Sequence, residues 1–381
     1  MSSLHEVVVV GAGPTGLSLG VALASRGHGV VLVDAQGEGR NTSRAAVVHA
    51  RTLEVLQPYG VADRLVEEGV QSSRFTVRDR DRVLLAIDFD ALPSPYRYAL
   101  MVSQARTEQI LLERLLALGG KVLRPRRLAA LCQDAHGVAA SLDDGATLRG
   151  HYLVGADGMH STVREAAGIA FDGGQYAESF LLADVQMTCS LPPDEVVLYF
   201  SPAGLVVVAP LPGGLHRIVA TMENAPETPG VDDLQRLLDA RGPARDRAVI
   251  RNVTWGSRFR VHHRLARRYR AGRILLAGDA AHVHSPAGGQ GMNTGIQDAV
   301  LLGELLGRVL DGADASLLDN YECQRRAAAR HVLQLAGRLT RFAVMQAAWR
   351  PWRNAGLSVL ASLPAFRRRL ALQLAGLDSR R

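Results

Sequence analysis

The sequence predicts an α/β fold in which a mostly antiparallel sheet domain is inserted and the C-terminal part is helical. Three observations lead to this prediction. Apolar runs typical of buried strands end in glycine turns at 11–16, 155–158 and 278–279. Short strand-like runs separated by Pro and Gly fill residues 179–222. Helical periodicity then dominates from Gly291 onward.

Residues 5–34 predict a compact βαβ unit. His5–Val10 has the pattern of a strand buried on both faces, and a helix is expected from Thr15 to Arg26, followed by a glycine cap. Gly29–Asp34 is the expected second strand. Such a unit opens the parallel sheet of Rossmann-like domains.

The turn inside this unit has the spacing of a dinucleotide-binding loop and consists of Gly11, Ala12, Gly13, Pro14, Thr15 and Gly16. Gly11 permits a tight turn, Gly13 lets the backbone approach a pyrophosphate, and Gly16 lets the helix pack closely on the sheet. The free N–H groups of the helix N-terminus favour an anion. Asp34, at the end of the second strand, sits where a carboxylate accepts hydrogen bonds from a ribose. The alternative is an ordinary strand–turn–helix with no ligand.

The second glycine turn follows the strand-like run Tyr152–Val154. Taken alone, it reads as an Asp-Gly turn followed by Ser161 as a helix N-cap. Beside a dinucleotide-binding fold, we expect Asp157 and Arg164 to help hold pyrophosphates, with Arg164 making charge-assisted contacts.

The third turn places Asp279 directly after another apolar strand, where it would accept a hydrogen bond from a ribityl hydroxyl of a flavin. A glycine-rich loop then opens a long helix, and its candidate cofactor-contacting residues are Pro286, Gly289, Gly291, Met292 and Asn293. The N–H groups of such a helix end can stabilise negative charge that develops on a reduced flavin.

With these three turns, the chain resembles the FAD-dependent aromatic hydroxylases of the para-hydroxybenzoate hydroxylase fold, over about residues 5–310. The segments Ser43–Ala45, Arg51–Leu56 and Ser103–Glu108 share in the resemblance. It implies that Arg44, Gln104 and Asp279 bind FAD, and that the segment from Asp157 to Arg164 serves both FAD and NAD(P)H. The chain departs from the family pattern at Asp298–Leu302, where the family often has Asp-Ala-x-Asn-Leu.

The resemblance also implies a reaction. NADPH or NADH reduces FAD by hydride transfer, the reduced flavin and O2 form a C4a-hydroperoxide, and one oxygen atom is transferred to an aromatic or polyketide-like small molecule. The expected activity is therefore that of an FAD-dependent, NAD(P)H-consuming monooxygenase. The alternatives are a flavoprotein reductase or oxidase, a redox-neutral tailoring enzyme on the same fold, and a non-catalytic binding protein.

Catalytic side chains are not indicated clearly. His49 and His216 are candidates, because an imidazole near neutral pH can help to deprotonate a phenol. Arg217, on a strand of the inserted sheet, is a further candidate. For each of the two histidines, an ordinary core or surface position is the competing interpretation. We expect no metal site, since His282 and His284 have no third ligand at a suitable spacing.

The composition excludes several other classes. The net charge of +7 comes almost entirely from scattered arginines, without the basic stripe and aromatic residues of a nucleic-acid-binding surface. The three cysteines suit a reducing compartment, and no apolar run of membrane-spanning length occurs, so a cytoplasmic protein is expected. We expect a monomer or a homodimer.

The expected domains are discontinuous: an FAD-binding domain formed by residues 1–72, 98–178 and 264–345, a substrate-binding sheet domain formed by 73–97 and 179–263, and a C-terminal helical tail, 346–381. The tail is basic and apolar at helical spacing between Trp349 and Leu374. We expect it to pack on the FAD-binding domain; a helix lying on a membrane surface is the alternative.

Overall fold

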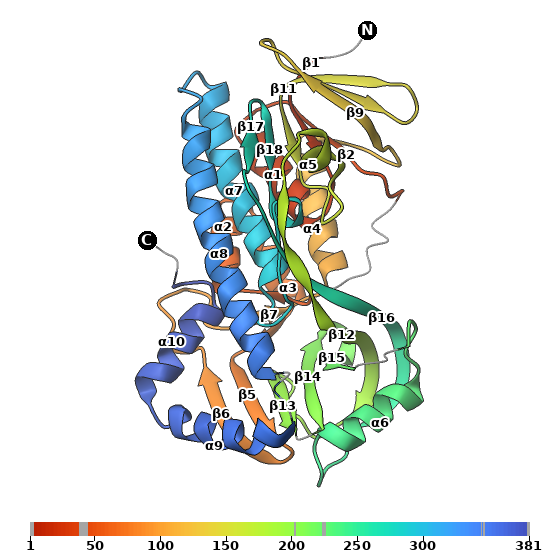
Figure 1. Ribbon diagram of the computed structural model, residues 1–381, viewed down its shortest axis with the longest axis vertical. Coiled ribbons are helices and arrows are strands. Elements are labelled where there is room, and N and C mark those ends of the chain that lie inside the picture. The colour runs from red at the N-terminus through yellow and green to blue at the C-terminus, as the bar shows by residue number, and fades with distance from the viewer. Residues whose placement is uncertain are drawn as a thin grey trace.

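The computed structural model describes residues 4–37, 45–201, 203–222, 226–343, 345 and 347–378. It is elongated, with one large sheet above another along its long axis, and long helices lie beside the upper sheet (Figure 1). Strands β12 and β16 run from the upper part into the lower one. The predicted fold class, an α/β domain with an inserted, mostly antiparallel sheet and C-terminal helices, is confirmed.

The first sheet is mixed and has the order β17-β18-β11-β1-β2-β8, with β10 paired to β11 and β9 paired to β10. The central pairs of β1 with β11 and with β2 are parallel. Its strands are β1 (Leu4–Val10), β2 (Val30–Val33), β8 (Lys121–Leu123), β9 (Leu128–Gln133), β10 (Val138–Leu142), β11 (Thr147–Gly155), β17 (Arg270–Ala271) and β18 (Ile274–Leu276).

The predicted βαβ unit is present as β1, α1 (Pro14–Ala24) and β2. Val7, Val8 and Val9 are fully buried, because a parallel sheet is covered on both faces. Helix α1 packs against α4 (Gln104–Ala117) and α7 (Gln290–Leu310). The parallel strands therefore all end at the edge of the sheet where the glycine turns follow.

The second sheet has the order β19-β16-β12-β15-β14-β13-β5-β6, and only its β13–β5 pair is parallel among the described pairs. Its strands are β5 (Arg74–Asp79), β6 (Arg82–Asp88), β12 (Phe171–Thr188), β13 (Glu195–Ser201), β14 (Gly204–Leu211), β15 (Leu215–Thr221), β16 (Val249–Ala266) and β19 (His282–Val283). The predicted meander is confirmed, and α6 (Val231–Arg241) covers one face of it.

Two features of this region were not predicted from the sequence. Strand β16 was not predicted, because few of its residues are fully buried and most of its exposed positions carry arginine, asparagine or threonine, which hides the alternation of a strand. The expected domain limits at 178/179 and 263/264 fall inside β12 and β16, so both strands continue through them.

A small third sheet joins β3 (Val47–Val48), β7 (Ala99–Met101) and β4 (Val70–Ser72). The helical periodicity of the sequence over 44–59 predicts a helix there, and this prediction is wrong in its first part, since β3 precedes α2 (Ala50–Leu56). The remaining helices are α3 (Ala62–Glu68), α5 (Thr162–Ala166), α8 (Leu317–Ala343), α9 (Arg350–Ala361) and α10 (Pro364–Leu374), with 3-10 turns at Gln57–Tyr59, Pro212–Gly214, Gly278–Ala280 and Ala347–Trp349.

The C-terminal tail forms two helices, because Pro364 starts α10 directly after α9 ends. Both helices pack against β6 of the second sheet, and they form the lower corner of the molecule in Figure 1. The expectation that the tail packs on the first sheet's domain is thus wrong for α9. No helix in the described part of the chain is long and apolar enough to cross a bilayer.

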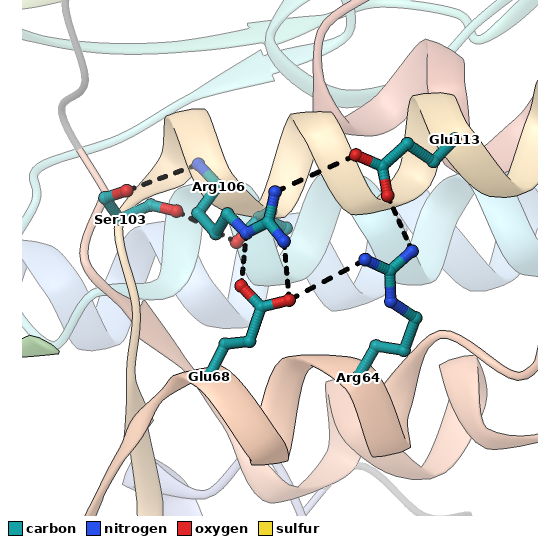
Figure 2. Close-up of polar contacts among 6 residues, drawn as sticks. Arg64, Glu68, Ser103, Arg106 and Glu113 are labelled. Atoms are coloured by element: carbon teal, nitrogen blue, oxygen red, sulfur yellow. Dashed lines mark hydrogen bonds and ion pairs between the residues drawn. The ribbon is translucent and has the colours of Figure 1, made fainter.

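Helices α3 and α4 are joined by alternating charges, shown in Figure 2. Arg106 is paired with Glu68, and its Nη1 lies 3.8 Å from Glu113 Oε1. Arg64 Nη1 donates to Glu113 Oε2 at 2.6 Å, and Arg64 Nη2 lies 3.7 Å from Glu68 Oε1. The hydrogen bond from Arg106 lowers the pKa of Glu68. Each charge has two opposite neighbours, so the four side chains form a closed ring.

We predict that Glu68→Gln lowers the free energy of unfolding by roughly 1 kcal/mol or less at low salt, because it breaks two of the ring's contacts. The loss should shrink in about 1 M NaCl, where the Debye length is about 3 Å. Urea unfolding at both salt concentrations measures this. Glu227→Gln, which removes one exposed partner of Arg258, is the control and should have almost no effect. Equal losses for the two variants would contradict the prediction.

Candidate functional site

In the first glycine turn, protein atoms lie close to two of the three glycines, and the third faces open space. Gly11 has a φ of +104°, and a Cβ there would lie 2.2 Å from the carbonyl oxygen of Ala156. A Cβ at Gly16 would lie 1.9 Å from the oxygen of Gly11. No heavy atom lies within 4 Å of a Cβ built on Gly13. Packing therefore requires the outer two glycines, whereas Gly13 faces space that a ligand can enter.

Asp34 closes this turn from the end of β2. Its Oδ2 accepts from Ala12 N at 2.6 Å and its Oδ1 from Gln36 N at 2.8 Å, which leaves further lone pairs for a ribose. Arg124, which follows β8, donates from Nη2 to Ala12 O at 2.8 Å and lies 4.0 Å from Asp34 Oδ2. Arg124 could not be recognised from the sequence, because it is the parallel pairing of β2 and β8 that brings it to the turn.

The second turn presents a buried carboxylate. Asp157 Oδ2 accepts from Val163 N at 3.1 Å, at the start of α5. Burial raises the pKa of Asp157. Its Oδ1 is buried and has no hydrogen-bond partner among the described residues. An acceptor in this position is suited to a hydroxyl or amide donor of a bound ligand.

Arg164 ties the second turn to the third. Its Nη1 donates to Ala280 O at 3.0 Å, its Nη2 donates to Met159 O at 3.0 Å, and its guanidinium lies 4.0 Å from the ring centre of Phe171. Burial lowers the pKa of Arg164. A direct contact of Arg164 with pyrophosphate stays a prediction, since the protein's own carbonyls and an aromatic ring surround this cation.

The third turn packs directly on the first. Gly278 has a φ of +62°, and a Cβ there would lie 2.5 Å from Thr15 Oγ1. A Cβ at Gly295 of α7 would lie 2.4 Å from the same oxygen. Thr15 is therefore held between two glycines, and Asp279 stands exposed beside it in the 3-10 turn Gly278–Ala280.

Asp298, on α7, holds the third turn in place. It is fully buried, and its Oδ2 accepts from Gly278 N at 3.1 Å and from His282 Nε2 at 2.6 Å. Arg325 of α8 donates to its Oδ1 at 2.5 Å. The sequence marked this stretch only as a departure from the family pattern; the structure shows that its aspartate joins the turn to two helices.

The loop before α7 is bound to the segment around β3. Gly289 has a φ of +64°, and a Cβ there would lie 2.2 Å from Val47 Cγ1. Asn293 accepts from His49 N at 2.8 Å and donates to Val47 O at 2.9 Å. His49 Nε2 donates to Gly288 O at 2.9 Å. His49 is thus a residue that positions the loop.

The end of α8 and the C-terminal tail also contact the loop before α7. Gly289 N donates to Pro286 O at 2.8 Å, which makes the loop a turn, and Met292 packs half-buried against the core. Thr340 Oγ1 donates to Ser285 Oγ at 2.6 Å, and Gln290 Nε2 donates to Leu374 O at 3.3 Å. Helices α8 and α10 therefore stabilise, through these hydrogen bonds, a loop that lies far from them in the sequence.

Gln104 and Arg217 meet at Ala45. Gln104 Oε1 accepts from Ala45 N at 3.2 Å, and Arg217 Nη1 donates to Ala45 O at 2.8 Å. Arg217 also makes two contacts of 2.7 Å with the carboxylate of Asp184. Because Arg217 is neutralised and nearly fully buried, it connects the second sheet to this segment. Arg44, the expected FAD contact next to it, lies outside the described residues.

The structure does not bring His216 to the glycine turns. It alternates with Arg217 along β15 and so lies on the face that α6 covers, where its Nε2 is 3.8 Å from Cys189 Sγ. Burial lowers the pKa of His216.

His284 was considered in the sequence only as a metal ligand, but it lies next to Gly291 at the start of α7. Its Nδ1 donates to Ser285 O at 2.9 Å, so its Nε2 carries the lone pair. This Nε2 is buried without a hydrogen-bond partner among the described residues. It could accept a proton or a hydrogen bond at the loop that opens α7.

These observations fit FAD. Gly13 leaves an open cradle at a helix N-terminus that no side chain caps, which suits a pyrophosphate. Asp34 stands at the strand end for a ribose, and Asp157 Oδ1 and His284 Nε2 are buried acceptors without partners in the described part of the chain. The three turns contact one another, so they form one site.

Comparison with known proteins decides the family. A profile described as FAD binding domain matches residues 5–336. The chain belongs to this family. Among other members, 6-methylpretetramide 4-monooxygenase of Streptomyces rimosus is 39% identical over 376 residues, which cover 96% of this chain and 67% of that protein.

Solved structures agree with this membership of the FAD binding domain family. The p-nitrophenol 4-monooxygenase PnpA from Pseudomonas putida DLL-E4 superposes with a TM-score of 0.88 at 26% identity, over 100% of both chains. The Diels-Alderase PyrE3 of pyrroindomycin biosynthesis superposes with a TM-score of 0.83 at 31% identity, over 98% of this chain and 81% of PyrE3. The chain is an FAD-dependent monooxygenase that uses NAD(P)H and O2, and the resemblance to aromatic hydroxylases is confirmed.

The open space at Gly13 gives a first test of the site. We predict that Gly13→Ala raises the dissociation constant of FAD about tenfold or more, which is about 1.4 kcal/mol, because the methyl group enters the pyrophosphate cradle. The apoprotein should keep its stability, since the added carbon meets no protein atom within 4 Å. Flavin fluorescence titration and thermal unfolding measure both. Gly356→Ala, at another open glycine, is the control and should leave FAD binding unchanged.

The two histidines at the loop predict a dependence of stability on pH. Burial lowers the pKa of His49 and of His284 to about 4. In the unfolded chain both titrate near about 6.5, so as pH falls from there the unfolded state binds protons that the native state does not. Stability should therefore be full above about pH 7 and should fall towards pH 4, by up to about 3 kcal/mol for each histidine.

Urea unfolding between pH 7.5 and pH 5 with excess FAD, at roughly half-unit steps, measures this slope. His49→Gln, which can still donate to Gly288 O, should make the slope shallower. His136→Gln, at an exposed position, is the control. A slope that the His49 variant leaves unchanged would rule out this origin of the pH dependence.

Proposed function

We propose that this monooxygenase hydroxylates an aromatic or polyketide-like small molecule. The observation that carries the proposal is the loop before α7, which lies against β3 and is held through Ala45 to the second sheet by Arg217. A substrate between this loop and the second sheet would be enclosed by both. The relatives 6-methylpretetramide 4-monooxygenase and p-nitrophenol 4-monooxygenase support the substrate class by their names.

The cofactor-binding residues follow from the contacts described above. We assign the pyrophosphate to the first turn and the ribose to Asp34, with Arg124 beside them as an additional cation. Asp157 and Asp279 accept hydrogen bonds from hydroxyl groups of FAD. Gln104 accepts a hydrogen bond from Ala45 N and so helps to hold the segment 45–49 in place. When bound, FAD supplies the redox and oxygen chemistry of the reaction.

The protein's own residues position and enclose the reacting groups. Helix α7 directs its free N–H groups at the loop, where they stabilise negative charge. His49 and Asn293 keep the loop in one conformation. His284 offers a buried, unprotonated Nε2 near the start of α7, and we assign it the role of accepting a hydrogen bond from the hydroxyl of a phenolic substrate.

The part of the protein that we expect to face the substrate is apolar. Ala46 and Met101, from the segment around the third sheet, form a buried cluster with Val196, Ala209 and Leu211 of the second sheet. An apolar aromatic ring suits a site at the edge of such a cluster. We also propose a cytoplasmic protein, a monomer or homodimer, and a substrate-binding domain centred on 73–97 and 179–263.

A panel of phenols and polycyclic aromatic compounds tests the function. We predict that a substrate accelerates NAD(P)H oxidation about tenfold or more, consumes O2, and yields a product heavier by one oxygen atom. His284→Leu should slow hydroxylation, because it removes the buried Nε2 that accepts a hydrogen bond from the substrate hydroxyl. Gly13→Ala, which weakens FAD binding, is the control for flavin dependence, and its activity should rise when excess FAD is added. A product of unchanged mass, formed without O2, would instead assign the redox-neutral chemistry suggested by the similarity to PyrE3.

A further inference from the structure

Helix α9 has one face packed against the protein and an outward face that carries apolar side chains. Arg353, Asn354 and Leu357 are buried against the rest of the protein. Asn354 donates to Asp79 Oδ2 at 3.0 Å and to Phe200 O at 3.1 Å, which fixes the orientation of the helix. The other face is therefore held outward by specific contacts.

The outward face is a continuous apolar stripe, which we call the α9 stripe. Residues seven or eleven positions apart differ by only about 20° around a helix. Trp352 and Val359 have this spacing within α9; exposed Leu363 follows the helix, Trp349 directly precedes it, and Leu360 lies next to Val359. Their exposed fractions are 74%, 68%, 51%, 61% and 43%, in the order Trp352, Val359, Leu363, Trp349 and Leu360. Three apolar side chains thus lie in solvent on α9 itself, and Trp349 and Leu363 extend the exposed apolar surface at its two ends.

A shallow hollow marks the N-terminal end of the stripe. It is lined by Met345, Trp349, Trp352 and Arg353, and its volume is about 490 Å³. Three of its four lining side chains are apolar, and the cation Arg353 is turned inward over the ring of Phe200, 4.5 Å from its centre. The stripe and the hollow form one apolar surface.

The segment of the chain that forms this surface carries charge of a single sign. From Cys323 to Leu377 the sequence contains ten arginines and no aspartate or glutamate. Arg367, Arg368 and Arg369 are exposed at the start of α10, directly after the stripe ends. Figure 1 shows α9 and α10 together at one corner of the molecule. A second copy placed face to face would bring these cations together, whereas an anionic partner would neutralise them.

We propose that the α9 stripe and the α10 arginines dock this enzyme on an anionic phospholipid surface. Tryptophan and aliphatic side chains with adjacent arginines are the composition of helices that lie in a membrane interface. The stripe would enter the boundary of the acyl chains, and the arginines would contact lipid phosphates. The bound enzyme would then stand where apolar aromatic compounds concentrate.

Vesicle flotation with the FAD-loaded enzyme tests this. Vesicles of phosphatidylcholine with about one quarter phosphatidylglycerol should bind the enzyme at least about tenfold better than pure phosphatidylcholine. The double variant Trp352→Ser/Val359→Ser should lose binding at all salt concentrations. Arg367→Ser/Arg368→Ser should lose only the preference for the anionic lipid. Leu116→Ser, at an exposed leucine of α4, is the control and should bind normally.

Tryptophan fluorescence gives an independent readout, because Trp349 and Trp352 are two of only three tryptophans. Brominated anionic lipids should quench most of the emission of the bound enzyme, and less in Trp352→Ser. All variants should keep their flavin content and melting temperature, since the stripe is exposed. Absence of binding, equal binding to both lipids, or a dimer that the double variant dissociates without any lipid binding would each overturn the proposal.

Discussion

The candidate site depends on one buried carboxylate. Asp298 has no exposure to solvent, and a lone charge in such a place would be strongly destabilising. Burial alone would raise the pKa of Asp298, but Arg325 and His282 hold it below its ordinary value, so the charge is kept and paired. Because Gly278 N donates to the same carboxylate, the position of the third turn is set jointly by α7 and α8.

This constraint passes to the other two turns by direct contact. Gly278 leaves room for Thr15 of the first turn, and Gly11 leaves room for the backbone at Ala156 of the second. Arg164 then returns from the second turn to Ala280 O in the third. The three turns therefore cannot move separately, and this rigidity is what a preorganised cofactor site requires. The glycines serve mutual packing as much as ligand approach, and among the described turn glycines Gly13 and Gly158 are free of the first role.

The sequence was informative wherever a local pattern determines structure. Apolar runs followed by Gly-rich turns predicted β1, β2, β11 and the turns themselves, because burial and positive φ leave direct traces in residue choice. It was silent where a role depends on partners far along the chain. His49 binds Gly288 and Asn293, and the polar pattern of β16 hid an 18-residue strand. Nothing in the residue type separates Arg217, which is a structural tie, from a catalytic arginine.

Arg217 also bears on how the two large sheets communicate. Its bidentate pair with Asp184 lies within the second sheet, and its Nη1 donates to Ala45 O. Ala45 N in turn donates to Gln104, and the residues that follow, Val47 and His49, contact the loop before α7. If a substrate displaced the second sheet, these hydrogen bonds would therefore transmit the displacement to the loop before α7.

Coupling between the second sheet and the loop is a difference in free energy between two states. This chain of contacts can therefore act only if the loop has a second arrangement that the substrate disfavours. The positive φ values of Gly288 and Gly289 make the loop the place where such an arrangement is sterically accessible.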